Sequence, residues 1–144
     1  MKRVLKQVLG VDVAQKELVV SLGRMHEDLV PEIYAYKVFA NSPKGFANLS
    51  DWVEQRLDPT VSVRYVMEAT GVYHEPFAYY LAELGCEVSI VLPNKISNYV
   101  RTLEAKTITD KTASQAIAMF GLERKLDQWT KPKAVYRTLK QLTR

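Results

Sequence analysis

Apolar positions from 61 to 93 follow two periods and predict a strand, a helix and a second strand. Alternating apolar residues suit a strand that ends at Glu68, and an Ala-Thr-Gly turn follows it. The next apolar residues recur at helical spacing as far as Gly85, and the run Cys86–Leu92 reads as the second strand. Such a β-α-β unit predicts parallel neighbouring strands, whose carboxyl ends are where open α/β sheets place reactive groups.

The segment before this unit predicts a three-stranded meander followed by a helix. Short links between the strands favour antiparallel pairing, with a polar loop at Arg24–Pro31. Asn41-Ser42-Pro43 is a helix-start signature, and the helical spacing that follows it ends at Asp58-Pro59. The predicted strands are Val4–Val13, Glu17–Leu22 and Ile33–Phe39.

The segment after Pro93 predicts helices. One amphipathic helix is marked by Ile96, Tyr99, Val100 and Leu103, and Thr107–Thr109 interrupts it. A second helix starts near Asp110, places Ile117 and Phe120 on its buried side and has Gly121 near its end. Lys131–Arg144 has a basic helical pattern.

The predicted element order is therefore β-β-β-α-β-α-β followed by helices. This is the order of the ribonuclease-H-like α/β fold, a mixed five-stranded sheet flanked by helices, here with a helical C-terminal extension. We expect the domain itself to span residues 1–122 and a basic helical extension to span 123–144. Because several chemistries use this fold, the site residues must indicate the function.

Composition excludes several classes of protein. The 144 residues are 47% apolar and 25% charged, which is ordinary for a soluble globular domain, and no apolar run approaches the roughly 20 residues of a membrane span. The start of the chain does not resemble a signal peptide, so we expect a cytoplasmic protein without a membrane partner. The single cysteine, Cys86, excludes a disulfide framework and a thiolate metal site.

Charge is divided unevenly along the chain. Residues 1–94 carry nine Lys/Arg and twelve Asp/Glu, a net −3, whereas residues 95–144 carry eleven Lys/Arg and four Asp/Glu, a net +7. A basic C-terminal third suggests a partner that bears phosphates, although a lysine-rich solvated helical surface gives the same composition.

Three acidic residues are candidates for a metal site. Asp12 lies in an otherwise apolar strand, where a charge is costly unless it is paired or bound to a cation. In the predicted sheet that strand neighbours the one ending at Glu68, and the helix that starts near Asp110 could dock at the same edge. Three carboxylates suit Mg²⁺ or Mn²⁺ better than zinc. The alternative is that Asp12 is an edge residue, Glu68 a surface residue and Asp110 a helix-capping charge.

Four ordered motifs that span nearly the whole chain resemble one family. The sequence is similar to the N-terminal domain of DEDD-type insertion-sequence transposases, RNA-guided recombinases related to the Piv DNA invertases. The family domain folds like the RuvC Holliday-junction resolvase. The matching stretches are Gly10-Val11-Asp12-Val13-Ala14, Met67-Glu68-Ala69-Thr70-Gly71-Val72-Tyr73, Val91-Leu92-Pro93-Asn94, and Lys106–Ala118 around Thr109-Asp110-Lys111.

The resemblance implies a Mg²⁺-dependent domain for DNA strand cleavage and transfer, with DNA and a guide RNA as partners and a homo-oligomer in the full-length protein. In the family four acidic residues gather the metal: Asp12, Glu68 and Asp110 match the first three as catalytic and metal-binding residues. Ala113 occupies the expected fourth position, so we expect weak binding of one cation and absent or very slow cleavage. The family's second domain, which carries a catalytic serine, lies outside this sequence, so we expect the extension 123–144 to begin a linker to it and this chain to be inactive alone.

Basic residues flank the acidic motifs. Lys95, Arg101, Lys106 and Lys111 are the candidates for contacts with nucleic-acid phosphates. His74 follows Glu68 closely, but the pattern favours a surface position for it. The alternative function is a non-catalytic nucleic-acid-binding or assembly module. A fragment of a sugar-kinase-like or actin-like ATPase is disfavoured, because six glycines leave little room for the phosphate loops that such proteins need.

Overall fold

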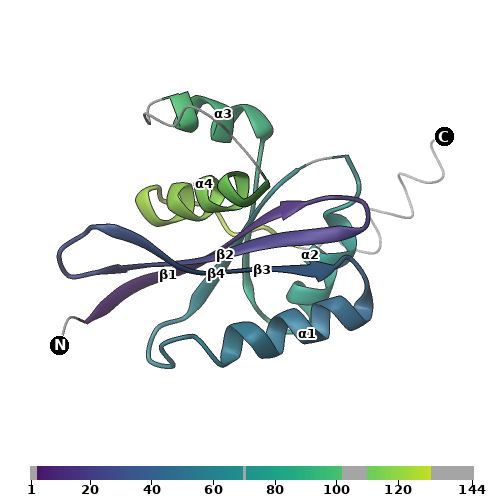
Figure 1. The fold of residues 1–144 in the computed structure, drawn as a ribbon, viewed down its shortest axis with the longest axis horizontal. Coiled ribbons are helices and arrows are strands. Elements are labelled where there is room, and N and C mark those ends of the chain that lie inside the picture. Colours follow the sequence, from purple (N-terminus) through teal and green to yellow (C-terminus); the bar gives the residue numbers. More distant parts are fainter. Residues whose placement is uncertain (1–2, 70, 102–109, 131–144) are drawn as a thin grey trace.

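Five strands form one mixed sheet that lies between two layers of helices (Figure 1). The computed structural model describes residues 3–69, 71–101 and 110–130, apart from the side chains of 110–112. The strand order is β3-β2-β1-β4-β5, in which β1 pairs antiparallel with β2 and parallel with β4. The elements are β1 (Val4–Val13), β2 (Glu17–His26), β3 (Pro31–Ala40), α1 (Pro43–Glu54), β4 (Val63–Glu68), α2 (Glu75–Glu83), β5 (Glu87–Val91), α3 (Pro93–Arg101) and α4 (Asp110–Glu123).

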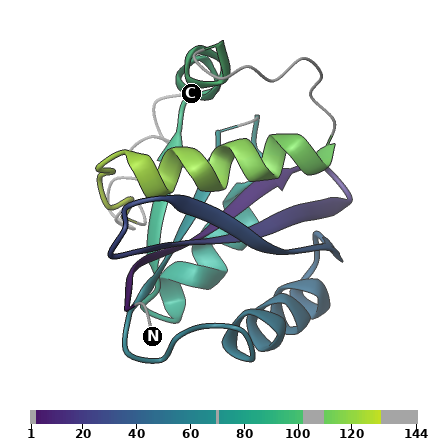
Figure 2. The same cartoon turned by 60° about the vertical axis from the view of Figure 1, so that its left-hand side comes forward.

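Each face of the sheet has its own apolar core, which is why both faces of β4 are buried. Tyr65 and Met67 point into the core shared with α1 and α2, whereas Val66 lies in the core shared with α3 and α4. Figure 2 shows α4 on one face of the sheet and α1 and α2 on the other. Alternation along a strand sends successive side chains to opposite faces, so the predicted period of two is confirmed.

The β2–β3 hairpin is longer than the sequence predicted. β2 continues to His26 and β3 begins at Pro31, so half of the predicted loop Arg24–Pro31 is strand and only residues 27–30 form the turn. Polar residues fit there because the end of the hairpin is solvated: Arg24 pairs with Glu32 across it at 3.3 Å, and its guanidinium lies 4.3 Å from the Tyr34 ring centroid. Cross-strand charge pairs of this kind stabilise a ladder that lacks apolar side chains.

Helix α1 begins where the sequence predicted. Ser42 is its N-cap residue, and the Gly45 amide donates to the Ser42 hydroxyl at 3.2 Å. The helix ends at Glu54, before the predicted stop at Asp58-Pro59, and Leu57 packs against the core from the loop beyond it.

In the β-α-β unit, Leu84 and Cys86 lie just outside the helix and the strand that the sequence predicted for them. Leu84 continues the helical spacing of apolar residues in the sequence, but it lies past the end of α2 and is 57% exposed. Gly85 closes the helix as predicted, with φ +75°. Cys86 is half-buried just before β5 and packs against the core.

Helix α4 crosses the sheet and ends at Glu123, so Gly121 lies near its end as predicted. A Cβ at Gly121 would come within 2.9 Å of Val66 and Val8 side chains, so this glycine allows close packing inside the helix. Residues 124–130 do not continue the helix; they run along β5, where the Trp129 amide donates to the Val88 carbonyl at 2.7 Å.

Several predictions fall on residues that the structure does not describe. These are the end of the first predicted amphipathic helix at Leu103, the interruption Thr107–Thr109 and the basic pattern of Lys131–Arg144. The division into a domain of residues 1–122 and an extension of residues 123–144 stays a prediction.

Candidate metal and nucleic-acid site

Asp12 and Glu68 lie on adjacent parallel strands at one edge of the sheet. The β1–β4 ladder ends with the pair Val11 and Met67, and each carboxylate belongs to the next residue along its strand. Both side chains are half-buried. The structure therefore brings together two of the three acidic residues that the sequence singled out.

The electrostatics of Glu68 reflect this position. Burial raises the pKa of the Glu68 carboxyl above its ordinary value, and the negative charge of Asp12 raises this pKa further. A carboxylate that is partly desolvated beside a like charge gains when a cation arrives, because the cation offsets both penalties. This edge of the sheet is therefore suited to a hard divalent cation.

The third predicted ligand, Asp110, is the first residue of α4. The path of α4 over the sheet is fixed by close contacts: a Cβ on Gly10 would meet the Ser114 carbonyl oxygen at 2.5 Å, and the Ser114 and Ser21 hydroxyls are 2.7 Å apart. Further along the helix, Gly121 lies over Val8. The helix thus runs from the carboxyl end of β1 toward its amino end, so its first residue lies toward the edge that carries Asp12.

A complete cation site is not formed by the described side chains alone. Among them, no three His, Cys, Asp or Glu groups lie close enough to hold a metal ion. The Asp110 side chain is outside the described part, whereas Ala113 is described and presents a half-buried methyl group. Asp12 and Glu68 supply oxygen donors of the kind that Mg²⁺ and Mn²⁺ prefer, so the residues present fit such an ion.

The turn that follows β4 places His74 differently from the sequence prediction. Gly71 adopts φ +59°, as a tight turn after Glu68 requires. His74 was expected at the surface, but it is only 9% exposed, and its Nδ1 atom is buried without a hydrogen-bond partner among the described residues. Burial lowers the pKa of His74 below its ordinary value, so it stays neutral at neutral pH. No pattern of spacing could have indicated this burial.

A basic groove begins one strand away from Glu68. Its floor is β5, whose Val91 pairs with Glu68, and its walls come from α3 and from the segment that follows α4. The cavity has a volume of about 630 Å³, and Lys95, Arg124 and Lys125 line it. Lys95 was predicted as a phosphate contact, whereas Arg124 and Lys125 were not predicted individually, and the positive charge of the C-terminal third was the available signal for them.

Of the other predicted phosphate contacts, the structure describes the side chain of Arg101. Arg101 is exposed at the end of α3. Lys106 lies outside the described residues, as does the side chain of Lys111.

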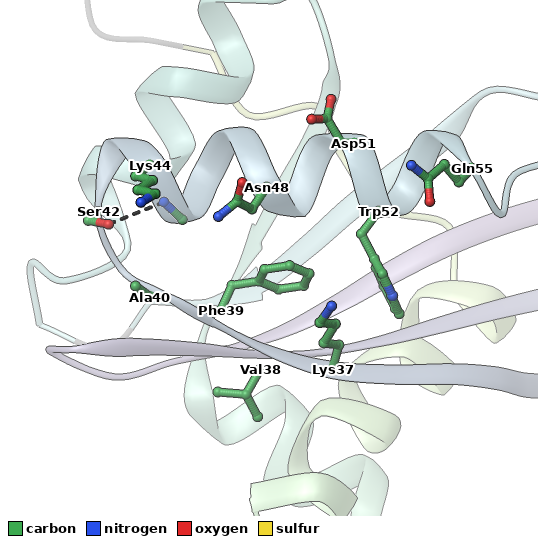
Figure 3. A pocket seen from close by; sticks show the side chains of 11 residues that line it. Lys37, Val38, Phe39, Ala40, Ser42, Lys44, Asn48, Asp51, Trp52 and Gln55 are labelled. Carbon is green, nitrogen blue, oxygen red and sulfur yellow. Dashed lines mark hydrogen bonds between the residues drawn. The ribbon is translucent and has the colours of Figure 1, made fainter.

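A second hollow, of about 610 Å³, lies between β3 and α1, on the face of the sheet away from α4 (Figure 3). Lys37 and Trp52 face one another across it, and Lys44 and Asp51 add charges of both signs. It borders neither Asp12 nor Glu68, so it does not extend the acidic edge. In the part of the chain that the structure describes, no helix has the length and apolar character needed to cross a membrane.

Comparison with solved structures identifies the fold. The structure of Thermus thermophilus RuvC superposes with a TM-score of 0.58 at 12% sequence identity, covering 85% of this chain and 99% of that one. Thermus thermophilus RuvC in complex with a Holliday junction substrate gives a TM-score of 0.55 at 14% identity, covering 79% and 91%. The ribonuclease-H-like fold predicted from the element order, and its RuvC-like form implied by the family resemblance, are therefore confirmed.

Comparison with known sequences identifies the family. The pilin gene-inverting proteins of Moraxella lacunata and Moraxella bovis are each 32% identical to this chain over 91 residues, which is 63% of this chain. The matched region covers 28% of each relative, so this chain corresponds to a minor part of those proteins. The model of the IS110-type DEDD transposase family, described as a transposase, matches residues 9–144. Because that match covers nearly the whole chain, the protein belongs to the IS110-type DEDD transposase family.

Proposed function

We propose that this chain is the metal-dependent DNA strand-cleavage and strand-transfer domain of a transposase or site-specific recombinase. Asp12, Glu68 and Asp110 hold Mg²⁺ or Mn²⁺ at the carboxyl edge of the sheet. The observation that carries the proposal is the pairing of two half-buried carboxylates on adjacent parallel strands, one of them with a raised pKa. Family membership gives the substrate class, because the relatives invert a pilin gene and the RuvC structure holds a Holliday junction.

The protein groups have separate tasks in this proposal. Asp12 and Glu68 present oxygen donors from rigid strands, and α4 brings Asp110 to the same edge. Bound there, a divalent cation would supply Lewis-acid stabilisation of the negative charge that develops on a phosphodiester during cleavage. Ala113, one helical turn after Asp110, offers no ligand, so a second cation is held weakly and cleavage by this chain is absent or very slow.

The basic groove is the proposed path of the nucleic-acid strand beyond the acidic edge. Lys95, Arg124 and Lys125 supply cations for phosphates, and Asn94 and Asn98 supply amide groups along the same wall. Arg101, Lys106 and Lys111 are further proposed phosphate contacts. DNA is the expected occupant, and a guide RNA and oligomerisation are proposed for the full-length protein from the family resemblance.

Calorimetric titration with Mn²⁺ tests the metal site. We expect weak binding to the unsubstituted chain, loss of binding in Asp12→Asn and Glu68→Gln, and binding at least about tenfold tighter in Ala113→Asp, since even outer ligand partners have effects of that size. Asp51→Asn is the matched control, because Asp51 is an exposed carboxylate on α1, on the other face of the sheet.

Two outcomes would contradict parts of this proposal. If Ala113→Asp binds Mn²⁺ no better than the unsubstituted chain, the account of Ala113 is wrong. If no variant binds Mn²⁺ while nucleic acid binds in a salt-sensitive manner that Asp12→Asn leaves unchanged, the alternative holds. The alternative is a non-catalytic nucleic-acid-binding or assembly module, which the alanine at the fourth acidic position favours.

A further inference from the structure

Asn41 joins three segments of the chain at the corner between β3 and α1. Its side-chain Nδ2 atom donates to the Ala14 carbonyl at 2.9 Å and to the Tyr73 carbonyl at 3.1 Å. Its backbone amide donates to the Lys16 carbonyl at 3.0 Å. A single residue therefore contacts both the β1–β2 turn and the turn that follows β4.

These two turns are the ones that continue the strands carrying the acidic pair. Ala14 comes two residues after Asp12, and Tyr73 comes five residues after Glu68. The backbone ladder between β1 and β4 ends at Val11, one residue before the first carboxylate. Beyond that point the Asn41 amide provides a link that the ladder no longer supplies.

The chemistry of the link requires an amide. Two carbonyl oxygens need two hydrogens, and the NH₂ group of asparagine supplies both from one short side chain. The contacts also fix which way the amide points, because the oxygen could not donate to either carbonyl. The Oδ1 atom is buried and has no hydrogen-bond partner among the described residues. The fold therefore bears the desolvation of this oxygen in order to keep the NH₂ group against the two turns.

We propose that Asn41 is a positioning residue for the cation site: by tying the turn after β1 to the turn after β4, it holds Asp12 and Glu68 at a separation at which both can bind one ion. The inference rests on the proposed function of these carboxylates. The like charges of Asp12 and Glu68 repel each other, and two carboxylates that move apart can no longer share one cation. Asn41 opposes that separation from a position outside the site.

Gln7 provides a matched control at the opposite end of the same strands. Its Nε2 atom also donates to two carbonyls, those of Asp58 at 3.0 Å and Val61 at 2.7 Å, and its side chain is buried. Gln7 thus makes the same kind of double contact from one amide to two carbonyls, but with the single loop before β4, at the amino end of that strand and away from both carboxylates. Removing either amide should lower the melting temperature. Of the two, we expect the Asn41 substitution to weaken cation binding and the Gln7 substitution to leave it nearly unchanged.

The test is Mn²⁺ calorimetry on the full chain and on Asn41→Ala, Asn41→Ser, Gln7→Ala and Asp12→Asn, each shown to be folded by circular dichroism. We expect Asn41→Ala to bind at least about tenfold more weakly and Gln7→Ala to bind within about twofold of the unsubstituted chain, as for partners that orient ligands. Asn41→Ser can keep one donor, so its affinity should be intermediate, and it stands in for the alanine variant if that variant does not fold.

The possible outcomes distinguish a failure of the role of Asn41 from a failure of the proposed metal site. If Mn²⁺ binding depends on Asp12 but is unchanged in the folded Asn41 variants, or falls equally in Gln7→Ala, Asn41 is merely structural and the inference is overturned. If the unsubstituted chain shows no Asp12-dependent binding, the proposed metal site itself is wrong and the inference falls with it.

Discussion

Replacing Gly10 by alanine should destabilise the fold, because Gly10 lies where the backbone of α4 packs closely on β1. A Cβ at this position would lie 2.4 Å from the Ala118 amide nitrogen, 2.5 Å from the Ser114 carbonyl oxygen and 2.8 Å from the Ala118 Cα. All three atoms belong to the backbone of α4, so no side-chain rotation can relieve the overlap. The helix must move away from β1 or the strand must bend.

Two opposing effects set the size of the loss. Replacing a glycine inside a strand by alanine favours folding by about 0.5–1 kcal/mol through the unfolded chain. Overpacking costs about 1–3 kcal/mol, and contacts with backbone belong at the upper end of that range. We therefore expect a net loss of about 2 kcal/mol. For a chain of this length that corresponds to a melting temperature lower by about 8 °C.

Gly23→Ala is the control. A Cβ there would meet the ends of two flexible side chains, Leu122 Cδ1 at 2.9 Å and Ile33 Cδ1 at 3.0 Å, and both can rotate away. We expect its free energy of unfolding to stay within about 1 kcal/mol of the unsubstituted chain. The measurement is thermal denaturation followed by circular dichroism. A Gly10→Ala variant that melts at or above the temperature of the unsubstituted chain, or a Gly23→Ala variant that loses as much, would refute the reasoning.

Two further predictions concern the sheet edge that carries Glu68 and the contact between α4 and β2. Because burial and Asp12 raise the pKa of Glu68, the folded chain binds that proton more tightly than the unfolded chain. The resulting stability is full below the ordinary glutamate pKa and is lost as the pH rises through the raised value. In chelator-treated buffer the melting temperature of the unsubstituted chain should therefore fall relative to that of Glu68→Gln as the pH rises from about 4, the ordinary glutamate value, through the raised pKa of Glu68, and parallel profiles would argue against this. Removing one partner of the buried Ser21–Ser114 hydrogen bond of 2.7 Å should cost about 1–3 kcal/mol. The double alanine variant should cost less than the sum of the single variants in chemical denaturation, whereas strict additivity would show that the two hydroxyls are not coupled.

The order of the elements could be predicted from the sequence because it depends on local signals. Apolar periods, the Ser42 cap and the Gly85 turn each act within a few residues, and they indicated the strands and helices in the right order. Juxtaposition of Asp12 and Glu68 followed from the expected sheet, because parallel neighbours end at one edge.

Features that depend on distant partners could not be predicted in this way. Gln7 interrupts an apolar strand in the sequence, but its buried amide bridges the loop before β4, which no period in the sequence shows. The polar end of the β2–β3 hairpin has the composition of a loop, because pairing between Arg24 and Glu32 replaces apolar contacts there. The burial of His74 and the amide link of Asn41 likewise depend on turns that approach only in the folded chain.

The packing of α4 bears on the choice of carboxylates at the proposed site. Small residues at Gly10 and Ala118 let the helix backbone come close to β1, the strand that carries Asp12. We propose that this close approach is what allows aspartates, with their short side chains, to serve at Asp12 and Asp110. Glu68 comes from β4, the strand beside β1, and in the proposed site its extra methylene gives it the reach to meet the same ion. On this proposal the close contact at Gly10 and the amide of Asn41 would set the spacing of the carboxylates, the first between α4 and the sheet and the second between the two strand ends.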